Sequence, residues 1–323
     1  MIAIRLVLIF LLWQVAGFKF GWAEEVADGE ALSGSTGSIE RRVAGRSFPS
    51  VFMAWSSATN LGDEDRMLTM ARHDLAFVGP SRTGLRWNRR PTGLADGFLT
   101  ESIAKAKDYR AQLHALNPNL ILLAEIRYRD AMHGYLPEDH PWWKRDEQGE
   151  RIVGWQEGPA YLLDFAHPEF RRQVARQARA AVAKGVFDGV MLDWWNDDPD
   201  RLSLLREVRE AVGPEAAIMV NANDRQTPKS APYVNGYFME CWRSKTRRDW
   251  DRLSATLRFA ETELRRPRIN CLETWYENSR ADLHRMRATT CLALTQSDGY
   301  CLFSDPNDLP SPDHRHDWYP FWD

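Results

Sequence analysis

The sequence has no excess of positive charge and none of the short motifs that bind nucleotides. Its 323 residues contain 42 Lys and Arg against 45 Asp and Glu, which gives a formal net charge of -3. A nucleic-acid-binding protein needs cations to neutralise phosphates, so we expect no nucleic-acid partner. Neither a Walker loop nor a GxGxxG loop occurs, and we predict no organic cofactor.

Cysteines are few, and no serine-hydrolase motif is present. The chain has four cysteines, Cys241, Cys271, Cys291 and Cys301, and no GxSxG elbow. No histidine pattern accompanies the cysteines, so serine-hydrolase and cysteine-protease functions have no support. In an oxidising compartment four cysteines allow three disulfide connectivities, but a domain of this size does not need them. Disulfides and buried free thiols are therefore equal alternatives.

Only the first residues form a long apolar run. Residues 1–23 begin with one cation, Arg5, and continue through the apolar residues 6–13, which is typical of a secretory signal peptide. The run is interrupted by Gln14 and Lys19 and falls short of the roughly 20 residues that cross a bilayer. We therefore expect a secreted or periplasmic protein with no membrane contact after cleavage, and an uncleaved membrane anchor is the alternative.

A polar segment separates this run from the remainder of the chain. Residues 24–46 are small, polar and rich in Gly and Ser, which predicts a flexible linker. Hydrophobic residues make up 44% of the chain and charged residues 27%, so a sizeable core is expected. Residues 47–323 are long enough for a single barrel domain, since (β/α) barrels take about 250 residues.

Short apolar segments alternate with amphipathic segments across this domain. The apolar segments predict eight strands, at residues 50–55, 75–79, 120–126, 189–194, 217–221, 236–241, 269–274 and 299–303. The amphipathic segments predict six helices, at residues 63–72, 100–116, 168–184, 202–212, 249–264 and 281–293. Parallel strands need helical crossovers, so this order predicts an α/β fold, the (β/α)8 TIM barrel. Residues 80–97 are loop-like, and a doubly wound open sheet is the alternative.

Polar side chains gather where the predicted strands end, which in a barrel is the end that carries the active site. Asp193 lies two residues after Met191, so both side chains point into the barrel if Met191 does. Five other strands also end in ionisable or amide groups: Glu125 and Arg127, Asn223, Glu240, Glu273, and Asp305. Converging anions are costly unless they are protonated, paired with Arg127 or used in catalysis, and we interpret them as a functional site.

The 14 tryptophans are concentrated in the same places. Those at or just after strand ends are Trp55, Trp194, Trp195, Trp242 and Trp275. Flat aromatic faces interleaved with carboxylates and amides suit a sugar, which has apolar C–H faces and a rim of hydroxyl groups. We therefore predict a carbohydrate substrate, whereas for Trp194 packing of a helix against the barrel is favoured. The long segment 128–160 also contains tryptophans and is interpreted as a lid.

A local resemblance adds to this prediction. Residues 187–195 (FDGVMLDWW), preceded by residues 162–171 (LLDFAHPEFR), resemble the fourth-strand region of glycoside hydrolases with a (β/α)8 barrel. Broadly, the chain is similar to the superfamily that includes the α-amylases and α-galactosidases. The resemblance implies that Asp193 is the nucleophile and that Glu240, or else Glu273, is the acid/base.

The fifth strand departs from that pattern. Amylases place a glutamate there, but this chain has residues 221–223 (NAN), which argues against an amylase-type assignment. Glycoside cleavage uses one carboxylic acid to protonate the leaving oxygen and a second carboxylate as nucleophile or base. We predict Asp193 and Glu240 as this pair. The predicted substrate contacts are Trp55, Glu125, Arg127, Trp195, Asn223, Trp242, Glu273, Trp275 and Asp305.

The predicted function is thus a secreted glycoside hydrolase that acts on a poly- or oligosaccharide. A carbohydrate-binding barrel without catalysis, in polysaccharide recognition or export, is one alternative, and a metal-dependent polysaccharide deacetylase is another. Residues 313–317 (DHRHD) have metal-ligand character, but a polar tail has the same composition, so we predict no metal site. The sequence specifies neither the sugar, nor retention or inversion, nor the oligomeric state.

Overall fold

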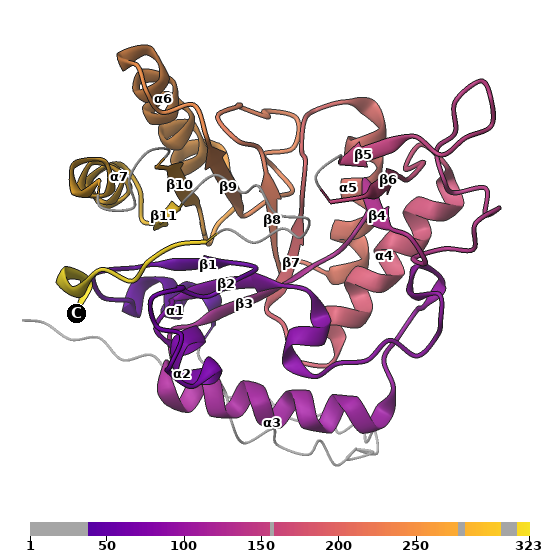
Figure 1. The fold of residues 1–323 in the computed structure, drawn as a ribbon, viewed down its shortest axis with the longest axis horizontal. Coiled ribbons are helices and arrows are strands. Elements are labelled where there is room, and N and C mark those ends of the chain that lie inside the picture. The colour runs from indigo at the N-terminus through magenta and orange to yellow at the C-terminus, as the bar shows by residue number, and fades with distance from the viewer. Residues whose placement is uncertain (1–37, 156–157, 277–281, 305–314) are drawn as a thin grey trace, which may run out of the picture. The chain divides into compact units, whose positions relative to one another are not determined.

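The computed structural model describes residues 38–155, 158–276, 282–304 and 315–323. At its centre is a ring of eight parallel strands (Figure 1), namely β1 (Phe52–Ala54), β2 (Leu75–Val78), β3 (Ile121–Glu125), β7 (Gly189–Leu192), β8 (Ala217–Asn221), β9 (Gly236–Cys241), β10 (Cys271–Trp275) and β11 (Tyr300–Ser304). Neighbours follow chain order, and a parallel bridge between Val51 and Cys301 joins the two ends. The predicted (β/α)8 barrel is confirmed, and the open doubly wound sheet is wrong.

Helices follow six of the strands and cover the outside of the ring. They are α2 (Arg66–Ala71), α3 (Thr100–Leu116), α4 (Pro168–Ala183), α5 (Pro199–Val212), α6 (Arg247–Glu263) and α7 (Leu283–Gln296). Capping side chains explain where two of them begin: Asp198 accepts bonds from the first backbone amides of α5, and Thr246 forms a capping box with Asp249 in α6. The connection from β8 to β9, residues 222–235, consists of turns.

Side chains of the strands alternate between the interior of the ring and its helix-covered outside. The interior cluster includes Phe52, Phe77, Leu123, Met191, Met219 and Phe238. Because Met191 belongs to this cluster, Asp193, two residues later, emerges at the mouth of the barrel. Glycine is required at Gly189, where a Cβ atom would lie 2.0 Å from the backbone oxygen of Ala217.

The long connection between β3 and α4 contains a small antiparallel sheet. Its strands are β4 (Asp130–Met132), β5 (Val153–Trp155) and β6 (Ala160–Leu162), with β6 in the middle. The backbone amide of Leu163 donates to the carbonyl of Arg129 at 2.8 Å, and the Tyr135 hydroxyl donates to Gln177 of α4 at 3.1 Å. The segment interpreted as a lid therefore includes a small hydrogen-bonded sheet, and Tyr135 of this segment is bonded to helix α4 of the barrel.

Part of the predicted linker is helical and belongs to the barrel domain. Residues 39–45 form α1 (Ile39–Gly45), in which Arg42 is only 5% exposed. The Arg42 guanidinium donates to both carboxylate oxygens of Asp188, at 2.6 and 2.9 Å, and to the carbonyl of Leu120 at 2.8 Å. Composition alone predicted a flexible segment, but residues 39–45 are helical and are held by the Arg42–Asp188 ion pair, by packing of Ile39 and Val43 on the core, and by a hydrogen bond from Asn119 to the Gly45 carbonyl.

Arg42 is one of two cations on Asp188. Arg110 of α3 donates to the same carboxylate at 2.5 Å. Burial raises the pKa of Asp188, but the hydrogen bonds and charges of Arg42 and Arg110 outweigh burial, so that the pKa lies below its ordinary value. The amino-terminal end of β7 is therefore tied to α1 and α3 through one ionised side chain.

The chain ends in an aromatic segment that packs on β11. Trp318 and Asn60 exchange two hydrogen bonds of 2.7 Å, one in each direction between backbone and side-chain amide. The Tyr319 ring is tilted against that of Phe303, with centroids 6.3 Å apart, and its centroid lies 5.0 Å from that of Trp322. These aromatic side chains are buried, so the last residues are part of the core.

The possible metal ligands of this segment are only partly described, because residues 313 and 314 lie outside the described ranges. His316 is fully buried, and its Nε2 lies 3.0 Å from Nε2 of His73. His73 Nδ1 contacts the carbonyl of Thr69 at 2.9 Å. Across the described residues, no group of three or more His, Cys, Asp or Glu side chains is arranged to hold a metal ion.

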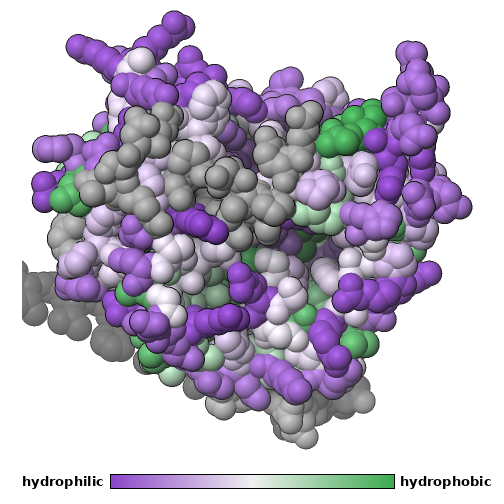
Figure 2. Space-filling model, viewed as in Figure 1, coloured by the Kyte–Doolittle hydropathy of each residue, from purple (hydrophilic) through white to green (hydrophobic). Residues whose placement is uncertain are grey.

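The surface and the cysteines complete the description. Figure 2 shows hydrophobic residues in small separate groups among hydrophilic ones on one face. All four cysteines are free thiols, with Cys291 exposed and the other three buried, so the structure supports thiols rather than disulfides. Within the described ranges, no helix combines the length and apolar character needed to cross a membrane.

Candidate active site

A cavity of about 520 Å³ opens at the carboxyl ends of the strands. Seven of the predicted site residues line it: Trp55, Arg127, Asp193, Asn223, Glu240, Trp242 and Trp275. The other lining residues were not predicted: Arg129, Asp130, Trp155, Trp194, Asn196, Arg201, Asn221 and Arg225. The predicted contact Asp305 lies outside the described residues. The cavity thus collects side chains from β1, β3, β7, β8, β9 and β10 at one end of the barrel.

One amide nitrogen joins the two predicted catalytic carboxylates. Asn221 Nδ2 donates to Asp193 Oδ1 at 2.8 Å and to Glu240 Oε2 at 2.7 Å. The orientation of this amide is fixed, because its oxygen accepts bonds from the backbone and side-chain nitrogens of Asn223 at 3.2 and 2.9 Å. The two carboxylate oxygens therefore lie within roughly 5.5 Å of each other, the combined length of the two bonds.

Hydrogen-bond donors and a cation surround the buried carboxylate of Asp193. Its Oδ1 also accepts a hydrogen bond from the backbone amide of Trp194 at 2.9 Å. Burial raises the pKa of Asp193 above its ordinary value, whereas the Asn221 hydrogen bond and the charge of Arg127 oppose that rise. Two donors and one nearby cation thus favour the ionised form in a site that otherwise penalises charge.

Glu125 does not line the main cavity, but its carboxylate pairs with Arg127, which does. The Glu125 side chain is 8% exposed, and Arg127 Nε lies 3.1 Å from its Oε1. Burial raises the pKa of Glu125, and the charge of Arg127 opposes this. Glu125 borders only a space of about 10 Å³, which has room for about one water molecule. Glu125 is thus not among the residues that line the main cavity, and its direct contact with substrate stays a prediction.

Glu273 is also below the cavity. It is fully buried, and its Oε1 accepts hydrogen bonds from Ser304 Oγ at 2.8 Å and from the indole nitrogen of Trp275. Across the β9–β10 pairing Glu273 lies directly opposite Glu240. The carboxylate holds Trp275, which lines the cavity, and does not line it itself, so a contact of Glu273 with substrate stays a prediction.

Trp194 and Trp195 have environments opposite to those predicted from the sequence. Trp195 is fully buried, its indole nitrogen donates to Ser230 Oγ at 2.8 Å, and it does not line the cavity, so its contact with substrate stays a prediction. Trp194 is 45% exposed and lines the cavity. The reason is local: Trp194 has a φ of 53°, in the left-handed region, which ends the strand alternation one residue before Trp195.

Two arginines, Arg129 and Arg201, contact Trp194 on one side of the cavity. The Arg129 guanidinium carbon lies 4.2 Å from the centre of the Trp194 ring, and Arg129 also pairs with Asp130 at 2.5 Å. Arg201 donates to the backbone oxygen of Trp194 at 3.0 Å and pairs with Asp198 at 2.5 Å. This side of the cavity is therefore held by cation–π and ion-pair contacts.

Asn221 is the residue whose role the sequence could have indicated. It is the last residue of β8, and its side chain has the same inward phase as Met219. Applying to β8 the alternation argument used for Asp193 points to Asn221 rather than Asn223. By contrast, no sequence pattern marks Arg129 or Arg225, which reach the cavity through the path of the connections.

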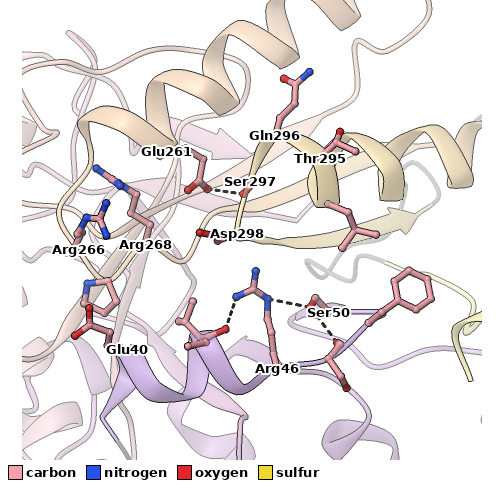
Figure 3. A pocket seen from close by; sticks show the side chains of 16 residues that line it. Glu40, Arg46, Ser50, Glu261, Arg266, Arg268, Thr295, Gln296, Ser297 and Asp298 are labelled. Carbon is pink, nitrogen blue, oxygen red and sulfur yellow. Dashed lines mark hydrogen bonds between the residues drawn. The ribbon is translucent and has the colours of Figure 1, made fainter. Parts of the chain in front are cut away.

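A larger cavity of about 920 Å³ lies at the opposite end of the barrel (Figure 3). Its polar groups are engaged with the surrounding fold: Arg46 donates to Val43 O at 2.6 Å and to Ser50 Oγ at 3.0 Å, and Glu261 accepts from Ser297 at 2.5 Å. Catalytic sites of such barrels lie at the carboxyl ends of the strands. We therefore place the active site in the smaller cavity.

Comparisons with known proteins agree with the fold. No family model and no curated protein matches the sequence. Among solved structures, the chain is similar in fold to glycoside hydrolases. An α-amylase from Lactobacillus plantarum matches with a TM-score of 0.52 and 12% identity, over 88% of this chain and 79% of that one.

Two further matches have the same character. A noncanonic maltogenic α-amylase from Thermotoga neapolitana, AmyB, gives a TM-score of 0.50 and 13% identity, over 84% of this chain and 72% of that one. The glycoside hydrolase domain of PelA from Pseudomonas aeruginosa gives a TM-score of 0.48 and 13% identity, over 80% of this chain and 95% of that one. At these identities the likeness concerns the fold, and the function has to be argued from the site.

Proposed function

We propose that the protein is a retaining glycoside hydrolase in which Asp193 is the nucleophile and Glu240 the acid/base. The observation that carries the proposal is the shared hydrogen bond of Asn221, which keeps the two carboxylate oxygens within roughly 5.5 Å. Retaining glycosidases have carboxyl groups about 5 to 5.5 Å apart, and inverting ones about 6.5 to 9.5 Å. The bound of roughly 5.5 Å on the two bonded oxygens agrees with a retaining pair, and on this we base the proposal of a covalent glycosyl intermediate.

The proposed reaction has two steps. Glu240 gives its proton to the glycosidic oxygen as the C–O bond breaks, and Asp193 bonds to the anomeric carbon. The Glu240 carboxylate then takes a proton from water, whose oxygen displaces Asp193 and restores both carboxyl groups. Asp193 receives donors from Asn221 and from the Trp194 amide, which suits the nucleophile because it must be ionised in the first step.

The lining of the cavity supports a carbohydrate substrate. Indole rings of Trp55, Trp155, Trp194, Trp242 and Trp275 surround the carboxylates. Such rings offer flat faces to the C–H faces of a sugar, while Arg127 and Asn223 offer hydrogen bonds to its hydroxyl groups. We further propose that residues 1–23 direct export and that the enzyme works in the periplasm or outside the cell.

The proposal is tested with Asp193→Asn and Glu240→Gln. Both variants are expected to lose about a thousandfold in turnover and to keep their affinity for sugar. Proton NMR of the first product should show the same anomeric configuration as in the substrate. Glu101→Gln is the control, because Glu101 is 62% exposed and pairs with Arg86 on the surface.

Other outcomes identify the alternatives. Sugar binding by the wild-type protein without turnover on any substrate would make it a binding protein. Release of acetate, abolished by chelators, would make it a metal-dependent deacetylase. An inverted product would keep the two carboxylates but change the role of Asp193 to that of a base for water.

A further inference from the structure

Two tryptophans at the rim of the cavity stand out by their exposure. Trp194 is 45% exposed and Trp242 is 50% exposed, and they are the only tryptophans among the exposed large hydrophobic side chains of the described residues. Both line the cavity that contains Asp193 and Glu240. Large apolar groups left in water at the edge of a polar cavity indicate a surface that a ligand covers.

Each of these rings has an arginine on one face. The Arg129 guanidinium carbon is 4.2 Å from the Trp194 ring centre, and that of Arg243 is 4.9 Å from the Trp242 ring centre. Both arginines are themselves held, Arg129 by Asp130 at 2.5 Å and Arg243 by Asp224 at 3.3 Å. The rings are thus fixed before a ligand arrives, which lowers the entropic cost of binding.

The strand order sets the two rings on either side of the carboxylates. Trp194 follows Asp193 directly, at the end of β7, and Trp242 follows Glu240 by two residues, at the end of β9. Between these strands lies β8, whose Asn221 bonds both carboxylates. A sugar chain positioned for cleavage at the carboxylate pair can therefore meet one indole on each side.

We infer that Trp194 and Trp242 are stacking platforms for sugar units on opposite sides of the cleaved bond, so that the enzyme cuts within a chain. This inference rests on the proposed glycosidase function and specifies its substrate class as an oligosaccharide or polysaccharide that extends in both directions. An enzyme that removes single terminal sugars needs a platform on one side only. The arginines act as positioning residues because they hold the rings and do not contact the reacting atoms.

The test uses three series of oligosaccharides of increasing length, labelled at the reducing end. One consists of α-linked glucose, one of β-linked N-acetylglucosamine and one of α-linked galacturonate. In the series that the wild-type enzyme cleaves, we expect internal cleavage. Trp194→Ala and Trp242→Ala should each lower kcat/KM for long chains about threefold to tenfold and shift the cleavage positions toward opposite chain ends.

Matched variants distinguish the loss of a stacking surface for sugar from general damage to the fold. Trp194→Phe and Trp242→Phe keep an aromatic face and should restore most of the wild-type cleavage pattern. Trp87→Ala removes a tryptophan that lies outside the cavity and stacks on Phe98 at 4.2 Å, and it should leave the cleavage positions unchanged. Arg129→Met and Arg243→Met should shift positions in the same direction as the adjacent Trp→Ala variant, but less.

The outcomes distinguish this inference from the proposed function. If the wild-type enzyme releases only terminal single sugars, or if both Trp→Ala variants shift cleavage toward the same end, the two-platform inference is overturned while the glycosidase function stands. If the wild-type enzyme cleaves none of the three series, nor a panel of aryl glycosides, the proposed function itself fails.

Discussion

The carboxylates of Asp193 and Glu240 share one hydrogen-bond donor, the side-chain nitrogen of Asn221, at 2.8 and 2.7 Å. Two carboxylates so close would repel each other if both were ionised. A donor placed between them lowers the cost of ionising either group. It also fixes their spacing, because the donor itself is held by Asn223.

Asn221→Ala is expected to lower kcat by about ten- to a hundredfold, because the variant loses hydrogen bonds to two carboxylates and bonds to charged groups are the stronger kind. The acidic limb of the pH–rate profile should move to higher pH, because without the donor Asp193 ionises less readily. Steady-state kinetics across pH measure both effects. Asn88→Ala, far from the cavity, is the control, and an unchanged pH profile in Asn221→Ala would contradict the role given to this amide.

Glu273→Gln distinguishes Glu273 from Glu240 as the acid/base. Because Glu273 is buried beneath the cavity and holds Trp275, its replacement should raise KM and change kcat by less than about tenfold. Glu240→Gln should lose activity on substrates with poor leaving groups and recover it on an aryl glycoside with an acidic leaving group. Recovery with an acidic leaving group in Glu273→Gln instead would reverse the assignment.

Arg42→Ala is expected to destabilise the barrel by about 3 kcal/mol, the lower end of the cost of breaking a buried ion pair, because Arg110 still contacts Asp188. Urea unfolding measures the change. Arg41→Ala, an exposed neighbour in α1, should have little effect. A chain that begins at residue 47 should lose at least as much stability as Arg42→Ala. Equal stability of chains beginning at 24 and 47 would show that α1 is dispensable.

Stability should fall in acid because of His73. Burial lowers the pKa of His73 to about 4, and an unfolded histidine has a pKa of about 6.5. Between these values the unfolded state binds more protons, so the free energy of unfolding rises with pH. The contribution of His73 to the free energy of unfolding is constant above about pH 6.5 and decreases by about 3 kcal/mol as the pH falls to 4. The charges that act on His73 are those of Arg72 and Glu64, and its ring contacts His316.

Urea unfolding at several pH values tests this prediction. His73→Gln should be less stable at pH 7, because it loses ring contacts to Thr69 and His316, but its stability should decline less between pH 6.5 and 4. His284→Gln, at an exposed position, is the control. His114 also has a pKa lowered to about 4 by burial, so part of the acid effect should persist in His73→Gln. An identical pH dependence in both variants would contradict the assignment to His73.

The sequence was sufficient where a periodic pattern determines geometry. The alternation of apolar segments predicted all eight strands, and the phase of Met191 correctly placed Asp193 at the mouth. The same reasoning failed at Trp195, because the left-handed backbone of Trp194 interrupts the alternation. A residue with positive φ leaves no periodic signal, so the exchange of these two tryptophans could not be predicted from spacing.

Depth within the barrel was the second property that spacing could not supply. Glu125, Glu240 and Glu273 all point inward, but only Glu240 lines the main cavity. Glu240 and Glu273 are opposite each other in the β9–β10 pairing, so what separates them is the packing around each side chain: Ser304 and the Trp275 indole hold the Glu273 carboxylate, and such contacts are a tertiary property. Likewise, the composition of residues 24–46 gave no indication that Arg42 would meet Asp188, 146 positions later in the chain.

The aromatic end of the chain has a consequence for the order of folding. Trp318 is bonded to Asn60, near the beginning of the domain, and β11 meets Val51. These contacts join segments that are distant in sequence, so the ring can close only after Cys301 and Trp318 have been synthesised. Until then the nascent polypeptide lacks its last strand pairing, and a chain that cannot complete its core during translation stays accessible to chaperones for longer.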